Sequence, residues 1–219
     1  MSTLLLRFAA PMQAWGADSR FDIRKTNREP TKSGVVGLLA AALGLQRDAP
    51  LNELTALRMG VRVDQEGVLL RDFHMVENQN EPEKPYVTTR YYLCDAVFLV
   101  GVFSEDEVLM RRLEEAVRCP AFPLFLGRRS CPPEGRVCLG LREMTLEDAL
   151  TSEPSLAAHG AVQQTERLRM VLEEPRGTAR LRDMPISFSP FDRQYGYRAA
   201  REIWMDQPTN EHDPMRELR

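Results

Sequence analysis

The chain has 219 residues, 43% of them hydrophobic and 28% charged, as expected for a globular protein that buries a sizeable core. A net charge of -3 argues against a protein that coats nucleic acid by bulk electrostatics, although it leaves room for a local basic groove. No apolar run is long enough to cross a bilayer and the N-terminus lacks a signal-peptide layout, so we expect a cytoplasmic protein without membrane contact.

Apolar periodicity over the first 145 residues predicts alternating strands and helices. In chain order, these elements are a strand over 3–10, a helix over 33–45, a short helix over 51–57, a hairpin of strands 59–63 and 68–73, a strand over 91–103, a helix over 104–118, and strands over 122–126 and near 137. The order β-α-β-β-α-β is that of a ferredoxin-like, or RNA-recognition-motif-like (RRM-like), domain. We therefore predict an α+β protein whose RRM-like domain spans 1–145.

Capping signals support both long helices. Thr31 or Ser33 can cap the first helix, and Ser104 followed by Glu107 forms a capping box for the second. Gly34 lowers the stability of the first helix relative to alanine. Its presence indicates that a packed strand or a ligand backbone approaches the helix closely.

The remaining residues, 146–219, are less regular because Gly, Pro and Arg interrupt the apolar pattern repeatedly. The predicted elements are a short helix over 146–150 and strands over 161–171, 179–181 and 198–205. We predict a small β-rich C-terminal appendage that ends in a charged segment over 207–219.

The four cysteines form no CxxC pair, and the three histidines lie far apart in the sequence. Structural zinc sites usually show closely spaced ligand pairs. We therefore predict no metal site and no cofactor, and we interpret the cysteines as reduced, mostly buried thiols.

The loop between the first strand and the first helix is basic. From Arg20 to Lys32 it carries five basic residues against two acidic ones, and Trp15 lies just before it. The helix that follows offers free backbone N–H groups and a partial positive charge at its N-terminus. A cationic loop, an aromatic residue and a helix N-terminus together suggest a surface for a phosphate-bearing chain.

Six segments, taken together and in order, resemble the CasD family of subunits of the type I-E CRISPR Cascade complex, within the repeat-associated mysterious protein superfamily. These segments are LRFAAPMQAWG (6–16), PTKSGVVGLL (30–39), LGLQRD (43–48), LRDFH (70–74), RYYLCDA (90–96) and LGRRSCP (126–132). They span roughly the first two-thirds of the chain, whereas the C-terminal third matches only in its aromatic and Arg-rich stretch 195–204.

The resemblance implies a non-catalytic subunit that holds the 5′ handle of a CRISPR RNA and caps the backbone filament. It also implies a thumb-like hairpin, here at about 76–90, that reaches towards the backbone subunit, and a contact with the large subunit of Cascade. The subunit would contact target DNA only indirectly, through the duplex that the DNA forms with the guide.

With this resemblance, single-stranded RNA is the expected ligand, held by Arg and Lys on phosphates and by aromatic side chains on bases. The candidate RNA-binding residues are Gln13, Trp15, Arg20, Arg24, Lys25, Arg28, Lys32, Ser33, Gly34, Arg90, Arg128, Arg129 and Ser130.

Each of these residues also has a structural interpretation. Lys32 binds a phosphate at the helix N-terminus, or is a solvated lysine beside an ordinary cap. Trp15 stacks on a base or closes the core, and Gln13 reads a base edge or satisfies backbone groups. Arg128 and Arg129 contact RNA from a turn, or pair with the acidic helix over 105–115. For the basic loop as a whole, the alternative is a solvated face.

Two other functions remain open. His74, with Lys84 and Tyr91 near it in the sequence, permits a metal-independent endoribonuclease that processes CRISPR RNA, because such cleavage needs a base and an acid. A pure protein-interaction scaffold would instead retain the guide after charge reversal at Arg24, Lys32 and Arg128. We expect the chain not to be an enzyme.

Overall fold

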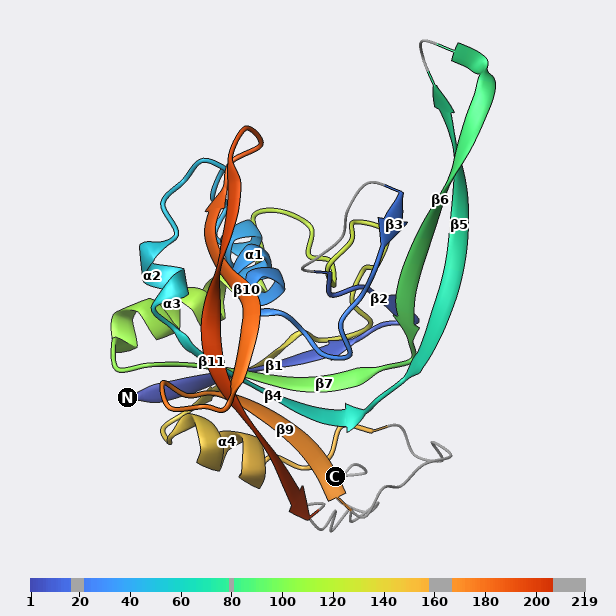
Figure 1. The fold of residues 1–219 in the computed structure, drawn as a ribbon. Coiled ribbons are helices and arrows are strands. Elements are labelled where there is room, and N and C mark those ends of the chain that lie inside the picture. The colour runs from blue at the N-terminus through green and yellow to red at the C-terminus, as the bar shows by residue number, and fades with distance from the viewer. Residues whose placement is uncertain (17–21, 79–80, 158–166, 207–219) are drawn as a thin grey trace.

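The computed structural model describes residues 1–16, 22–78, 81–157 and 167–206. They form an α+β fold dominated by two sheets, as the sequence predicts (Figure 1). The elements are β1 (Ser2–Ala9), β2 (Met12–Gln13), β3 (Ile23–Arg24), α1 (Lys32–Ala42), α2 (Asn52–Thr55), β4 (Arg58–Gln65), β5 (Val68–Asn78), β6 (Glu81–Cys94), β7 (Val97–Ser104), α3 (Glu107–Arg118), β8 (Cys138–Arg142), α4 (Leu146–Ser152), β9 (Arg167–Glu173), β10 (Ala179–Phe188) and β11 (Arg193–Asp206).

The larger sheet has the strand order β10-β11-β9-β4-β7-β1-β8, and every neighbouring pair is antiparallel. Strand β1 shows why its sequence is apolar throughout. Leu4 and Leu6 point into a core shared with α1 and α3, whereas Leu5 points into a smaller core shared with α4. Because successive strand residues face opposite sides of a sheet, both faces of this strand are covered.

One predicted strand pairing is wrong, and one predicted strand is divided in two. The strands expected at 59–63 and 68–73 exist, but β4 pairs with β7 and β9 in the larger sheet, whereas β5 pairs only with β6. The chain leaves the sheet at Gly67, whose φ of +71° favours glycine. The strand expected over 91–103 is likewise two strands, β6 and β7, separated by a turn at Asp95 with φ of 55°. A local apolar pattern predicts a strand without naming its partner.

The β5–β6 hairpin, here called the thumb, rises far out of the body of the protein (Figure 1). It spans 68–94 and is therefore longer than the predicted 76–90. Within the smaller sheet, β6 also pairs with the short strands β2 and β3. The thumb is thus anchored at its base by the N-terminal segment of the chain.

The C-terminal region is rich in strands, as predicted, but it is not a separate appendage. Strand β9 pairs with β4, and β11 and β10 follow in the same sheet. The expected boundary at residue 145 therefore runs through one continuous sheet. Residues 161–166 of a predicted strand and the charged segment 207–219 lie outside the described residues.

Two local predictions need correction, and several are confirmed. Residues 122–126 form a loop instead of a strand, and α3 is capped by Asp106, whose carboxylate accepts a hydrogen bond from the backbone N–H of Leu109. Thr31 caps α1, as predicted. Helix α4 also occurs where the sequence predicts a helix. None of the helices in the described ranges is long and apolar enough to cross a membrane.

Candidate nucleic-acid interface

A cleft of about 700 Å³ opens beside α1, and we call it the basic cleft. Its basic side chains are Arg24, Lys25, Arg47, Arg128, Arg129 and Arg193. Its aromatic side chains are Trp15, Phe122, Phe125, Phe188 and Tyr195. No aspartate or glutamate is among the described residues that line it. The described walls therefore present positive charge together with flat apolar rings.

Segments far apart in the sequence meet at this cleft. Backbone contacts join the loop after β2 to the turn at Gly127, because Ala14 N–H donates to the Leu126 carbonyl at 3.2 Å. Gly127 has φ of +85°, and a Cβ atom there would overlap the Ala14 carbonyl. Only glycine fits at this position. The close approach places Arg128 and Arg129 beside Arg24 and Lys25 of the basic loop.

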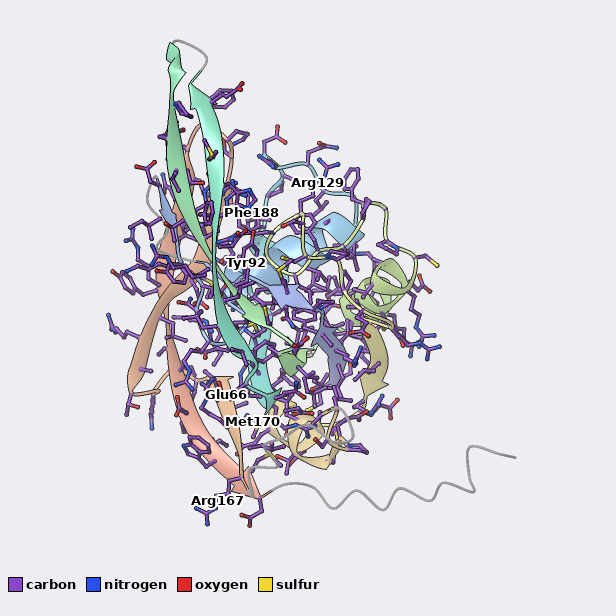
Figure 2. The ribbon with its side chains drawn as sticks, turned by 90° about the vertical axis from the view of Figure 1, so that its right-hand side faces the viewer. Glu66, Tyr92, Arg129, Arg167, Met170 and Phe188 are labelled. Carbon is purple, nitrogen blue, oxygen red and sulfur yellow. The ribbon has the colours of Figure 1, made fainter. Side chains whose placement is uncertain are left out.

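Arg128 is held in place and keeps one free donor. Its guanidinium lies 4.5 Å from the ring centre of Tyr92, at the base of the thumb. Its Nη2 donates to the Arg24 carbonyl at 3.0 Å, whereas its buried Nη1 has no hydrogen-bond partner among the described residues. In Figure 2, the labelled Tyr92, Arg129 and Phe188 all lie in the upper half of the body, around α1. An oriented arginine with an unsatisfied donor is suited to an anionic ligand.

The aromatic residues of the cleft divide into exposed rings and a buried one. Phe122 is 42% exposed and Phe125 is 37% exposed, so both can accept a stacked base. Trp15 is 1% exposed and stacks on Phe8 with ring centres 5.5 Å apart. Trp15 therefore closes the core beneath the cleft, which is the structural alternative considered for it.

Trp15 also explains Gly34. A Cβ atom on Gly34 would lie 2.9 Å from two carbon atoms of the Trp15 ring. The close approach inferred from the helical glycine is therefore made by this indole, which packs against α1.

Gln13 is fully buried and does not face the basic cleft. Its Nε2 donates to the Ala96 carbonyl at 2.7 Å, and its Oε1 accepts a hydrogen bond from Trp15 Nε1 at 3.2 Å. Both ends of the amide are thus satisfied inside the protein. The hypothesis that Gln13 reads a base edge is not supported, because the side chain joins β2 to the turn before β7.

Lys32 is the largest departure from the predicted site. Its side chain is 2% exposed, and its Nζ lies 2.7 Å and 2.8 Å from the two carboxylate oxygens of Glu173. Burial lowers the pKa of Lys32, and the Glu173 carboxylate opposes that shift. The Lys32 backbone N–H donates to Asp183 Oδ2 at 2.9 Å. A carboxylate of the protein therefore occupies the helix N-terminus where a phosphate was expected.

The other predicted residues lie in different settings. Ser33 is buried against Thr31, and Ser130 is exposed beside Cys131. Arg28 is exposed, pairs with Glu66 at 3.3 Å and does not line the basic cleft. Arg20 lies outside the described residues.

Arg90 lies on β6, where the strand pairing sets it opposite Arg24 on one side and Asp72 on the other. Its buried Nε has no hydrogen-bond partner among the described residues. Arg90 is therefore close to the basic loop at the base of the thumb, although it does not line the basic cleft itself.

Several residues of the cleft were missed by the sequence analysis. These are Arg47, Phe122, Phe125, Phe188, Arg193 and Tyr195. Phe188, Arg193 and Tyr195 come from the β10–β11 hairpin, which rises beside α1 in Figure 1. The aromatic and Arg-rich character of the stretch from 195 was visible in the sequence. Its position beside the N-terminal helix depends on sheet pairing, and that pairing was not visible in the sequence.

His74 does not form a catalytic pair with Tyr91. His74 lies opposite Thr88 in the thumb, whereas Tyr91 lies opposite Arg71, so the two side chains project from opposite faces of the ribbon. His74 Nε2 instead lies 3.0 Å from Asp72 Oδ2. The side chain of Lys84 is outside what the structure describes.

Within the described residues, no group of three His, Cys, Asp or Glu side chains is placed to hold a metal ion. The four cysteines carry free thiols, and two of them, Cys131 and Cys138, are buried. Burial raises the pKa of the Cys131 thiol. The described part of the basic cleft therefore offers charge, hydrogen-bond donors and rings.

The chain is similar to several CRISPR-associated proteins. A family model described as CRISPR-associated protein (Cas_Cas5) matches residues 3–201. The CRISPR system Cascade subunit CasD of Escherichia coli (strain K12) is 40% identical over 159 residues, which are 64% of this chain and 70% of that protein.

Two solved structures are similar over most of the chain. "Crystal structure of Cas protein" matches with a TM-score of 0.77 and 41% identity, covering 94% of this chain and 97% of that one. A chain of "CRISPR RNA-guided surveillance complex" matches with a TM-score of 0.81 and 33% identity, covering 94% and 91% respectively.

Proposed function

Because the chain belongs to the CRISPR-associated Cas5 protein family, we propose that it is a non-catalytic subunit of a Cascade surveillance complex that holds the 5′ handle of the CRISPR RNA. The observation that carries this proposal is the basic cleft, in which six basic and five aromatic side chains meet without a described acid. The proposal places the protein in the cytoplasm, together with its guide.

Arg128, Arg129 and Arg193 contact phosphates of the handle and fix its path, because phosphate contacts position a nucleic acid without reading its sequence. Phe122 and Phe125 stack on unpaired bases, which every base allows. The free Nη1 of Arg128 supplies a donor that is already oriented by Tyr92. This arrangement suits single-stranded RNA better than a duplex, whose bases would not reach the rings.

The thumb contacts a protein neighbour, for which we propose the backbone subunit of Cascade. Leu69, Phe73, Met75 and Val87 are all more than half exposed. The strand pairing sets them on one face of the ribbon. An exposed apolar stripe of this kind is typical of a protein interface. The subunit then caps the filament, contacts the large subunit and meets target DNA through the guide duplex.

We also propose that the core of the larger sheet is ferredoxin-like. The elements β1, α1, β4, β7, α3 and β8 follow one another in βαββαβ order once the thumb, the short strands β2 and β3 and the short helix α2 are set aside. Their strands lie side by side as β4-β7-β1-β8, all antiparallel. The thumb is thus an insertion between the second and third strands of this core.

No observation favours the endoribonuclease, since His74 and Tyr91 lie on opposite faces of the thumb. We expect His74→Ala to leave the length and amount of mature guide unchanged. Accumulation of uncut precursor RNA in this variant would contradict the non-catalytic assignment.

The proposed function is tested by charge reversal in the assembled complex. We expect Arg24→Glu, Arg128→Glu and Arg193→Glu, introduced together, to release the guide or strongly weaken its retention. The matched control is Arg111→Glu, Arg136→Glu and Arg176→Glu, three exposed arginines that do not line the cleft. The measurement is the amount of CRISPR RNA that copurifies with the complex.

Ultraviolet crosslinking on the unmodified complex locates the groove. Peptides that contain Phe122 and Phe125 should crosslink to the 5′ end of the guide. Crosslinks only to other subunits, together with normal guide retention in the reversed variant, would favour the protein scaffold instead.

A further inference from the structure

A second cleft, of about 810 Å³, is lined by the segment that precedes α1. Arg24 and Lys25 line the basic cleft, residues 26–30 line the second cleft, and Thr31 lines both. The far wall of the second cleft is formed by β9, β10 and β11. In Figure 2, Glu66, which lines it, lies well below Phe188 of the basic cleft.

Two exposed aromatic residues lie along this cleft. Tyr197 is 64% exposed and Trp204 is 59% exposed, and both belong to β11. They are seven positions apart, which corresponds to about 23 Å along an extended strand, and this odd separation sets the two side chains on opposite faces of β11. Each ring lines the cleft and is exposed enough to accept a stacked base.

The acids of the second cleft are already paired. Glu29 and Glu66 lie 3.0 Å and 3.2 Å from the guanidinium of Arg169, and Glu202 lies 3.6 Å from it. Asp183 pairs with Arg198 at 2.8 Å. Each of these carboxylates therefore has an arginine partner, although three of them share Arg169.

The remaining positive charge is not paired in this way. Arg180 and Arg182 are exposed on β10, and no ion pair joins either to a described residue. Arg198 is 2% exposed and is held by Asp183 through Nε and Nη2, yet within the part of the chain that the structure describes its Nη1 has no hydrogen-bond partner. A buried guanidinium with an unused donor at the wall of a cleft is uncommon unless a ligand or water completes it.

We propose that the second cleft binds single-stranded nucleic acid, separately from the basic cleft. Arg180 and Arg182 contact its phosphates, and unpaired bases stack on Tyr197 and Trp204. Because Thr31 lines both clefts, the strand is either guide RNA that continues past the basic cleft or an unpaired strand of the opened target DNA. The shared chemistry is an unpaired, phosphate-bearing strand, and the site requires no handle sequence.

Tryptophan fluorescence of the full chain tests this proposal. The chain has two tryptophans, of which Trp15 is buried under the basic cleft and Trp204 lies exposed in the second cleft. The probes are hexauridylate RNA and hexathymidylate DNA, neither of which carries a handle sequence. We expect saturable quenching by one or both probes, and loss of that quenching in Trp204→Phe.

Charge reversal supplies the second measurement. Arg180→Glu combined with Arg182→Glu leaves Trp204 in place and should weaken probe binding by roughly tenfold or more. Arg111→Glu combined with Arg136→Glu is the matched control and should bind as the unmodified chain does. Stronger quenching by RNA assigns the site to the guide, and stronger quenching by DNA assigns it to the target strand.

Absence of quenching by both probes would overturn the proposal. Unchanged affinity after reversal of Arg180 and Arg182, or quenching that persists in Trp204→Phe, would also overturn it. The reversal of Arg24, Arg128 and Arg193 separates this site from the proposed function, because it should remove the guide and leave Trp204 quenching intact.

Discussion

Arg24 and Lys32 belong to the same basic stretch of sequence, but the fold places them in opposite settings. Arg24 is exposed at the basic cleft, where its carbonyl accepts a hydrogen bond from Arg128. Lys32 is buried eight residues later against Glu173 of β9. Strands from the C-terminal part of the chain supply Glu173 and Asp183 to the Lys32 end of this stretch, and Arg193 to the basic cleft at the Arg24 end.

The difference shows that local charge does not decide whether a basic residue meets a ligand. The N-terminus of α1 would attract an anion, and here the carboxylate of Asp183 accepts the Lys32 backbone N–H. Asp183 comes from β10, which also ends at Phe188 in the wall of the basic cleft. The same strand therefore fills one potential phosphate site and helps to build another.

The largest expected effect is that of Lys32→Ala on stability. Removing the ammonium leaves the Glu173 carboxylate, which is 16% exposed, without its partner. We expect a loss of about 3 kcal/mol in the free energy of unfolding, since breaking a buried ion pair from one side is strongly destabilising. For a chain of this length that corresponds to a Tm lower by roughly 6–12 °C, measurable by calorimetry.

A second variant isolates the cause. Lys32→Met combined with Glu173→Gln removes both charges and keeps an acceptor for the Met59 backbone N–H, which Glu173 binds at 3.2 Å. It should recover part of the lost stability. Folded Lys32→Ala should retain the guide, and loss of the guide without loss of stability would show that Lys32 contacts RNA after all.

The sequence predicted the elements better than their partners. Strand β1, the Thr31 cap and helix α4 follow from local patterns, because capping and periodicity are properties of neighbouring residues. The pairing of β9 with β4 joins segments more than a hundred residues apart, and no local signal specifies it. That pairing makes the C-terminal strands part of the main sheet.

The residues of the candidate site also differ in whether local sequence or long-range pairing places them. Arg128 and Arg129 could be predicted because a glycine turn presents them directly after an apolar segment. Arg193 and Tyr195 could not, because they reach the basic cleft only through the β10–β11 hairpin. Lys32 and Gln13 were predicted as ligand-binding residues because their burial could not be foreseen from the sequence. That burial depends on residues that arrive from distant segments.

Gln13→Leu should produce the next largest effect, again on stability. The substitution leaves the buried Ala96 carbonyl and Trp15 Nε1 without their partners. We expect a loss of about 2 kcal/mol, because an unsatisfied buried polar group keeps its full desolvation penalty. Denaturant unfolding measures the loss, and guide retention at a temperature where the variant is folded should not change. A stable variant with reduced guide retention would restore Gln13 as a base-reading residue.

Salt dependence distinguishes Arg129 from Arg28. Arg129 is exposed and lines the basic cleft, whereas Arg28 pairs with Glu66 outside it. We expect Arg129→Ala to reduce the slope of log affinity for the guide handle against log salt by about 0.7, the value for one contact on a single strand. Arg28→Ala should leave that slope unchanged. Equal slopes for the two variants would mean that the basic cleft does not define the path of the RNA.

The smallest expected effect is the pH dependence of stability that Lys32 contributes. Burial lowers the pKa of Lys32 below its ordinary value of 10.5, and Glu173 only partly offsets this. Between the lowered pKa and 10.5 the unfolded chain therefore binds more protons at this site than the folded chain does. The free energy of unfolding should rise with pH in that window, relative to Lys32→Met, and then level off. A fall in the same window would mean that the Glu173 ion pair outweighs the desolvation of Lys32.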